Sequence, residues 1–196
     1  MQKMNKKINL TLLLLVAVIT LAAANAPRVG RATLVSVEKN LDGRIRTLWD
    51  DNPYLLLGST RGVYLEGYGA VFTAEVDLVV NPTSLMNANI KKDEIVKFHQ
   101  KKLERIPLLK KALCEAMVSV ATSLDSVPPD EQITIVAFLP NHSWEDMTGI
   151  PTQLTLQATR RKLLDAQRAG GAGHLQAPFN TQVWGALDSA IRVTEN

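Results

Sequence analysis

The residues best suited to chemistry lie together in one loop, from Pro140 to Pro151. This loop follows an apolar segment and contains a histidine, a tryptophan and two acids, at His142, Trp144, Glu145 and Asp146. Imidazole and carboxylate groups can act as a general base with its orienting partner, or together as metal ligands. The spacing matches no defined metal-binding signature, however. A polar surface loop whose tryptophan covers the edge of the core is the competing interpretation.

Two acids further up the chain are a second candidate for catalysis. Glycoside hydrolysis needs two carboxyl groups across a cleft, and the predicted hairpin carries Glu66, Glu75 and Asp77. Of these, Glu75 and Asp77 share one face of an alternating segment. Because that face is predicted to be solvated, we interpret both as surface residues. Neither Cys114 nor any serine stands in a G-x-S-x-G elbow. No glycine-rich phosphate loop is present either, so we predict no cofactor.

The N-terminus has the pattern of a secretory signal peptide. Its first nine residues hold three lysines and no acid, and an apolar run from Leu10 to Ala24 follows. An uncleaved anchor is the alternative, but the run is shorter than the roughly 20 residues that cross a bilayer. We therefore predict cleavage after Ala24, with a signal peptide over 1–24 and one domain over 25–196. The mature protein would be exported, periplasmic or secreted, without a stable membrane span.

Removing this leader balances the formal charge of the chain. The sequence has 22 Lys and Arg against 19 Asp and Glu, and the three leader lysines make up the difference. Because nucleic-acid binding needs a basic surplus, we predict no nucleic-acid partner. The lysine-rich stretch 91–111 is interpreted as a solvated helix face. Recognition of an anionic polymer or membrane surface by this stretch is an alternative.

Apolar spacing predicts the elements that position these residues. In chain order they are a helix over 32–49, a hairpin over 63–80, a long helix over 92–124, strands over 133–139 and 154–159, a short helix around 163–169 and a closing helix over 181–193. This order favours an α+β two-layer sandwich, a mainly antiparallel sheet of about four strands with helices packed on one face. Pro107 predicts a kink or a new start in the long helix. The segment 133–139 is apolar on both alternations, as is typical of a strand covered on both faces.

The hairpin is the local structure that the sequence defines best. With Gly67 and Tyr68 as a two-residue turn, Val63 would lie opposite Phe72 and the apolar residues would share one face. The long strand from Ala70 to Val80 would then have backbone groups without a partner on one side. We expect these groups to be covered by the N-terminal helix or by a homodimer through the sheet edge.

The segment RGVYLEGYGAVFTAEVDLV, residues 61–79, contains the motif G-Y-G-x-x-F from Gly67 to Phe72. It resembles stretches of uncharacterised exported bacterial proteins. The resemblance covers about a tenth of the chain. It implies a bacterial periplasmic or secreted setting and no activity.

These observations favour a non-enzymatic extracytoplasmic module for binding or scaffolding. Its partner would be a protein or a cell-envelope component, bound at the sheet edge or at the loop from His142 to Asp146. The argument is that three histidines, one cysteine and no recognisable catalytic constellation leave binding as the default. The alternative is a small periplasmic hydrolase or metal-dependent enzyme with its site in the loop 140–151.

Overall fold

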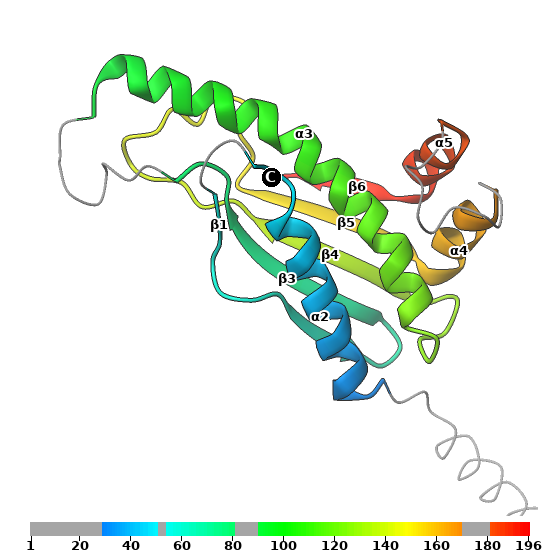
Figure 1. The fold of residues 1–196 in the computed structure, drawn as a ribbon. Coiled ribbons are helices and arrows are strands. Elements are labelled where there is room, and N and C mark those ends of the chain that lie inside the picture. Colours follow the sequence, from blue (N-terminus) through cyan, green and yellow to red (C-terminus); the bar gives the residue numbers. More distant parts are fainter. Residues whose placement is uncertain (1–28, 51–53, 81–89, 170–180) are drawn as a thin grey trace, which may run out of the picture.

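A computed structural model describes residues 29–50, 54–80, 90–169 and 181–196. Its elements are α2 (Arg31–Arg46), β1 (Leu55–Leu56), β2 (Arg61–Leu65), β3 (Gly69–Asp77), α3 (Lys92–Ser123), β4 (Gln132–Phe138), β5 (Gln153–Thr159), α4 (Arg160–Ala169), α5 (Thr181–Ala190) and β6 (Arg192–Glu195) (Figure 1). The predicted signal peptide lies outside the described residues. Among the described helices, none has both the length and the apolar composition of a membrane span.

The strands form one six-stranded sheet in the order β1-β3-β4-β5-β6, with β2 pairing with β3 beside β1. β3 and β4 are parallel and are connected through α3, whereas every other pair is antiparallel. The predicted α+β class with a mainly antiparallel sheet is therefore confirmed. The predicted number of about four strands is too low, because the two short strands β1 and β6 give no clear alternation in the sequence.

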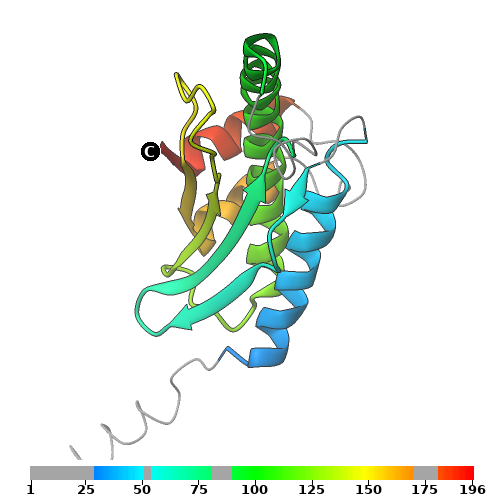
Figure 2. The ribbon, with the colours of Figure 1, turned by 90° about the vertical axis from the view of Figure 1, so that its left-hand side faces the viewer.

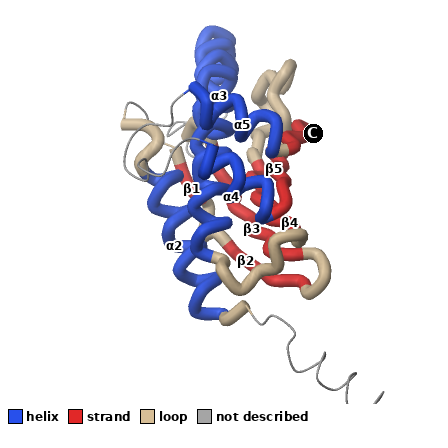
Figure 3. Tube along the Cα trace, turned by 90° about the vertical axis from the view of Figure 1, so that its right-hand side faces the viewer, coloured by secondary structure: helices blue, strands red, loops and turns tan. Residues whose placement is uncertain are grey.

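The helices lie on one face of this sheet, which we call the covered face. Figure 2 shows α2 and α3 on one side of the strands, and Figure 3 shows α4 and α5 on that side as well. Phe72, Ile135 and Leu156 of the sheet are buried, as are Leu41 of α2 and Leu109 of α3. Fully burying such a side chain stabilises the fold by about 1.5–3 kcal/mol. The core of the molecule thus lies between the covered face and the helical layer.

The long helix α3 runs without interruption from Lys92 to Ser123 and includes Pro107. The structure therefore has one continuous helix, and no second helix starts at Pro107. Pro107 has no amide hydrogen, so one backbone hydrogen bond is missing at that turn. Pro107 is exposed, which allows water to hydrate the carbonyl group left without a partner. Acidic Asp93 and Glu94 in the first turn suit the positive end of the helix dipole.

The hairpin forms, but its register differs by one residue from the prediction. Val63 lies opposite Val71 instead of Phe72, and the loop has three residues instead of two. Gly62 takes the place opposite Phe72, where a Cβ atom would come within 2.5 Å of the phenyl ring. The ring therefore fills the space above a residue without a side chain. Because a slip of one residue exchanges the two faces of a strand, Val63 and Leu65 leave the covered face.

The start of β3 requires a glycine. Gly69 has a φ of +129°, and a Cβ atom there would lie 1.9 Å from the carbonyl oxygen of Gln132 on β4. Only glycine tolerates both the left-handed backbone and so close an approach. This position therefore fixes where the two parallel strands begin to pair.

The end of the chain is a strand where we expected the closing helix to continue. α5 ends at Ala190, and β6 pairs antiparallel with β5, placing Val193 opposite Leu156. The carbonyl of Asn196 also accepts a hydrogen bond of 2.6 Å from the Thr152 amide. The prediction of a helix to residue 193 is wrong at its end, because pairing at the sheet edge overrides helical spacing.

The long strand of the hairpin is not at an edge. β1 and β2 pair with one side of β3 and β4 pairs with the other. The backbone groups for which we expected an external partner or a covering helix therefore have partners within the chain. This removes the reason that we gave for dimerisation through this edge.

Candidate functional site

The predicted site loop, from Pro140 to Pro151, lies against the first half of α3. The ammonium group of Lys102 pairs with the Glu145 carboxylate, and both side chains are almost wholly buried. The same ammonium donates a hydrogen bond of 3.3 Å to the Pro140 carbonyl. A buried charge is tolerated only when it is paired and hydrogen-bonded. These contacts therefore fasten the loop to the helix.

Aromatic rings strengthen this attachment at the surface. Phe98 of α3 meets Trp144 edge-on with 5.7 Å between ring centroids, and His142 stacks on Trp144 at 5.6 Å with the planes 7° apart. Nδ1 of His99 lies 2.8 Å from the Asp146 carbonyl oxygen. Of the four predicted residues, His142 and Asp146 are exposed, and Trp144 is half-buried.

The acids of this region have different surroundings. The Asp146 carboxylate accepts a hydrogen bond of 2.9 Å from the Thr148 amide, and this bond lowers the pKa of Asp146. Oε1 of Glu145 is buried and has no hydrogen-bond partner among the described atoms. Asp77, at the end of β3, is buried too. Desolvation raises the pKa of Asp77, while the Lys102 charge acts in the opposite direction.

The predicted loop residues do not converge on one point. Glu145 faces Lys102, Asp146 closes its own turn, and His142 stacks on Trp144. Within the described ranges, no three His, Cys, Asp or Glu side chains gather as a group that could hold a metal ion. The loop as an enzyme site stays a prediction, and this geometry adds no metal centre to it.

Three charged residues were wrongly predicted to be solvated. Lys102 and Arg105 of the lysine-rich stretch are only 2% and 1% exposed, and Asp77 is 8% exposed. The Arg105 guanidinium donates to the Leu78 carbonyl and lies 5.0 Å from the ring centroid of Trp49. Each interaction joins segments far apart in the sequence. No local pattern could have distinguished these residues from the exposed lysines around them.

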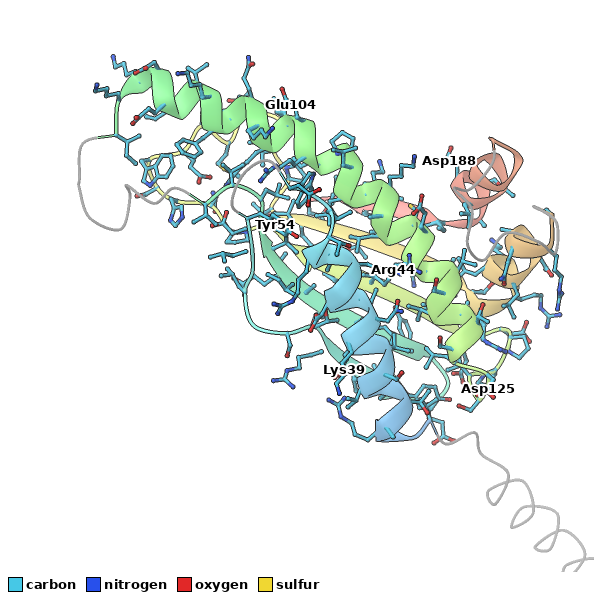
Figure 4. All side chains as sticks on the ribbon, viewed as in Figure 1. Lys39, Arg44, Tyr54, Glu104, Asp125 and Asp188 are labelled. Carbon is cyan, nitrogen blue, oxygen red and sulfur yellow. The ribbon has the colours of Figure 1, made fainter. Side chains whose placement is uncertain are left out.

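A tyrosine and an arginine form hydrogen bonds within the helical layer and beside it. Tyr54, directly before β1, donates a hydrogen bond of 2.8 Å to the Ile45 carbonyl of α2 (Figure 4). Arg44 of α2 donates to Oγ of Ser119 on α3 at 2.8 Å. This bond borders a polar hollow of about 270 Å³ between the two helices. On β2, burial and the nearby Glu131 carboxylate raise the pKa of Tyr64 to about 12.

The sheet face opposite the helices, which we call the open face, carries a second candidate site. Strand pairing places on it alternate residues of β1 to β4, with two residues of the adjoining loops. These are Leu55, Leu57, Arg61, Val63, Leu65, Tyr68, Val71, Thr73, Glu75, Asp77, Gln132, Thr134, Val136 and Phe138. Of the nine large hydrophobic side chains that are exposed in the described part of the chain, six belong to this set. Exposed apolar surface is thus concentrated on one face.

Apolar and polar side chains are interspersed on the open face: Arg61 lies beside Thr73 of the central strand β3, and Glu75 of the same strand lies beside Phe138. Val63, Leu65 and Phe138 are 48%, 49% and 44% exposed. Arg61 and Glu75, of opposite charge, are both exposed as well. Over β5 the face becomes polar, with threonine and glutamine at alternate positions from Gln153 to Thr159.

The pattern of β4 does not match its surroundings. Its sequence is apolar on both alternations, which predicts cover on both faces, and parallel strands are usually buried on both faces. Ile133 and Ile135 are buried against the helices, but on the open face Val136 is half-buried and Phe138 is exposed. On the open face the described chain therefore covers the start of β4, where Thr134 is 5% exposed, and leaves the end of the strand exposed at Phe138.

No family model, no curated protein and no solved structure matches this chain.

Proposed function

We propose that this chain is a non-enzymatic binding module that docks a partner protein on its open face. The observation that carries the proposal is the concentration there of six of the nine exposed large hydrophobic side chains. Exposed apolar side chains that gather on one face often mark an interaction site, whereas singly scattered ones need no explanation. Exposed apolar residues that had no role would be scattered over the molecule.

The chemistry of the open face suits a protein more than a small molecule. A sheet face presents a broad pleated surface, so a ligand would gain contacts from area more than from enclosure. Each 100 Å² of apolar surface removed from water contributes roughly 2.5 kcal/mol before the costs of association. Arg61 and Glu75 would orient the partner through their charges.

The loop at the end of β4 supports the same interpretation. Its Glu145 carboxylate is engaged by the Lys102 ammonium, and its Asp146 carboxylate accepts from the Thr148 amide. Groups held in this way stabilise a loop and are poorly placed to exchange protons with a substrate. In this proposal the loop holds α3 in place behind the sheet. The predicted leader would place the partner outside the cytoplasm, as a protein or cell-envelope component.

The proposal can be tested by site-specific photo-crosslinking in an extract of the source cells. A photoreactive amino acid replaces Val63 on the open face or, as the control, Lys39 on the exposed side of α2. We expect a discrete adduct from position 63 only. Unlabelled wild-type protein should compete for it, whereas unlabelled Leu65→Lys protein should not. Equal adducts from both positions, or none from position 63, would contradict the proposal.

A further inference from the structure

We infer that the partner on the open face is a second copy of this chain, packed sheet to sheet across a two-fold axis. This inference rests on the proposed function. It identifies the partner as a second copy, which presents the same open face that this structure describes.

The charges of the open face complement themselves. Arg61 lies opposite Thr73 on the neighbouring strand, and Glu75 is two residues further along β3, so the two charges are diagonal neighbours. A two-fold interface brings the same patch from each copy into contact. Arg61 of one copy can then face the partner's Glu75, and this contact occurs twice. A patch with charges of one sign would repel its own copy.

The apolar pattern also fits a second sheet. Face-to-face sheets pack about 10 Å apart through interdigitating side chains. The open face offers three valines for such contacts, Val63, Val71 and Val136, one on each of three adjacent strands. A second copy would supply the same set and would cover Phe138. The strand β4 would then have the cover on both faces that its sequence predicts.

The polar half of the open face limits how far the two sheets overlap. Thr155 and Gln157 of β5 lie on the open face, opposite Val136 and Thr134. Nε2 of Gln157 donates to the Tyr68 hydroxyl, which lies 3.3 Å from Oγ1 of Thr134. Burying these groups under an apolar surface would cost free energy. We therefore place the interface over β1 to β4 and leave β5 and β6 in solvent.

The size of this area predicts the strength of the dimer. β3 has nine residues, which at about 3.3 Å per residue gives roughly 30 Å along the strands. Three adjacent strands about 4.8 Å apart span roughly 15 Å across them. The product, on the order of 450 Å² per copy, is below the roughly 800 Å² per partner of a stable complex. We expect a reversible dimer with a dissociation constant in the micromolar range or weaker.

Sedimentation equilibrium of the purified protein at several concentrations tests the inference. We expect the wild-type protein to change from monomer to dimer as its concentration rises. Leu65→Lys on the open face should weaken the dimer at least tenfold. Leu103→Lys is the matched control, because Leu103 is 40% exposed on α3, outside the open face. It should leave the dissociation constant unchanged.

A charge exchange tests the proposed orientation. Arg61→Glu and Glu75→Arg should each weaken self-association, because each places like charges across the interface. An equimolar mixture of the two variants should associate again, since one copy then carries two acids and the other two bases. Circular dichroism of each variant, matched to wild type, would show that the fold is retained. A mixture that stays monomeric would overturn the two-fold pairing of Arg61 with the partner's Glu75.

Failure of this inference can be distinguished from failure of the proposed function. A wild-type protein that stays monomeric at every concentration, while position 63 still gives a competed adduct in extract, would overturn the second copy and keep the docking face. A dimer that Leu65→Lys does not weaken would also overturn it, since the interface would lie elsewhere. A monomer without any adduct would overturn both.

Discussion

At the scale of single residues, the pair formed by Lys102 and Glu145 determines how the loop 140–151 is held. We expect Lys102→Met to lower the free energy of unfolding by about 3–5 kcal/mol, because it leaves the buried Glu145 carboxylate without its counter-charge. Urea denaturation at pH 7 measures this change. The double variant Lys102→Met with Glu145→Leu should recover part of the loss, since no charge is then left buried.

The exposed pair of Lys110 with Glu195 is the control for this measurement. Both side chains are at least 40% exposed, and their charged atoms are 2.9 Å apart. Exposed pairs contribute about 0–1 kcal/mol, so Lys110→Met should change stability little. Equal effects of the two lysine substitutions would show that burial does not distinguish the pairs.

Asp77 makes stability depend on pH. Its pKa is raised by burial from 3.8, the ordinary value for aspartate, so the folded protein holds this proton more tightly than the unfolded chain does. The stability that this proton contributes is complete below pH 3.8 and is lost as the pH rises through the native pKa. We therefore expect Asp77→Asn, which keeps an Oδ1 acceptor for the Val79 amide, to be more stable than wild type at pH 7.

Urea titrations of both proteins at pH 7 and at pH 3 check this expectation. The difference should amount to roughly 1.4 kcal/mol for each unit by which the pKa is raised, and it should almost disappear at pH 3. A variant that is less stable than wild type at pH 7 would mean that the charged carboxylate is favoured in the fold, for example through the Lys102 ammonium.

The candidate loop shows how far single residues could be predicted. Its composition placed His142 and Glu145 in a loop at the end of an apolar strand, and the structure has them there. It could not predict that Glu145 pairs with Lys102, 43 positions earlier in the chain. Lysines in a run give the same pattern whether one of them is buried or all are solvated. Only the packing of α3 on the loop decides between these cases.

At the scale of elements, the hairpin shows how a correct element can have an incorrect register. Alternation predicted both strands, and Gly67 lies in the turn with a φ of +79°. Register depends on whether the loop has two or three residues, and the sequence suits both. The contact of the Phe72 ring with Gly62 decides in favour of three. This choice exposes Val63, and the open face therefore could not be predicted from the sequence.

The glycine at the start of β3 gives a prediction at this scale. Gly69→Ala should lower the free energy of unfolding by at least about 2 kcal/mol, because it strains the backbone and forces Cβ against the Gln132 carbonyl. Gly43→Ala is the control, since a Cβ atom in that part of α2 meets nothing within 4 Å. It should stabilise the protein by about 0.5–1 kcal/mol. Thermal denaturation of both variants measures the two effects.

The two glycine variants are informative only when compared with each other. Opposite signs would show that the parallel start of β3 and β4 is fixed by backbone approach. If Gly69→Ala were as harmless as Gly43→Ala, the strands would have to separate at their start without cost, which contradicts the pairing of Gly69 with Gln132.

At the scale of the whole molecule, the helices cover one face of the sheet, and the other face carries six of the nine large hydrophobic side chains that are exposed in the described part of the chain. The sequence predicted helices on one face, and it also predicted cover on both faces of β4. Within a single copy these two predictions conflict. The two predictions agree if a surface of another molecule covers β4 on the open face. For this reason we infer from the fold that the open face binds a partner.

The last prediction follows from that connection. If unfolding of the wild-type protein must also dissociate a dimer, its Tm should rise with total protein concentration. For a domain of this size, a hundredfold increase should raise Tm by about 2–4 °C at most. The Tm of Leu65→Lys protein should change less with concentration than that of the wild type, and the Tm of Leu103→Lys should follow the wild type. Differential scanning calorimetry at several concentrations measures these values. A wild-type Tm that is independent of concentration would mean that the open face is not covered by a second copy when the protein unfolds.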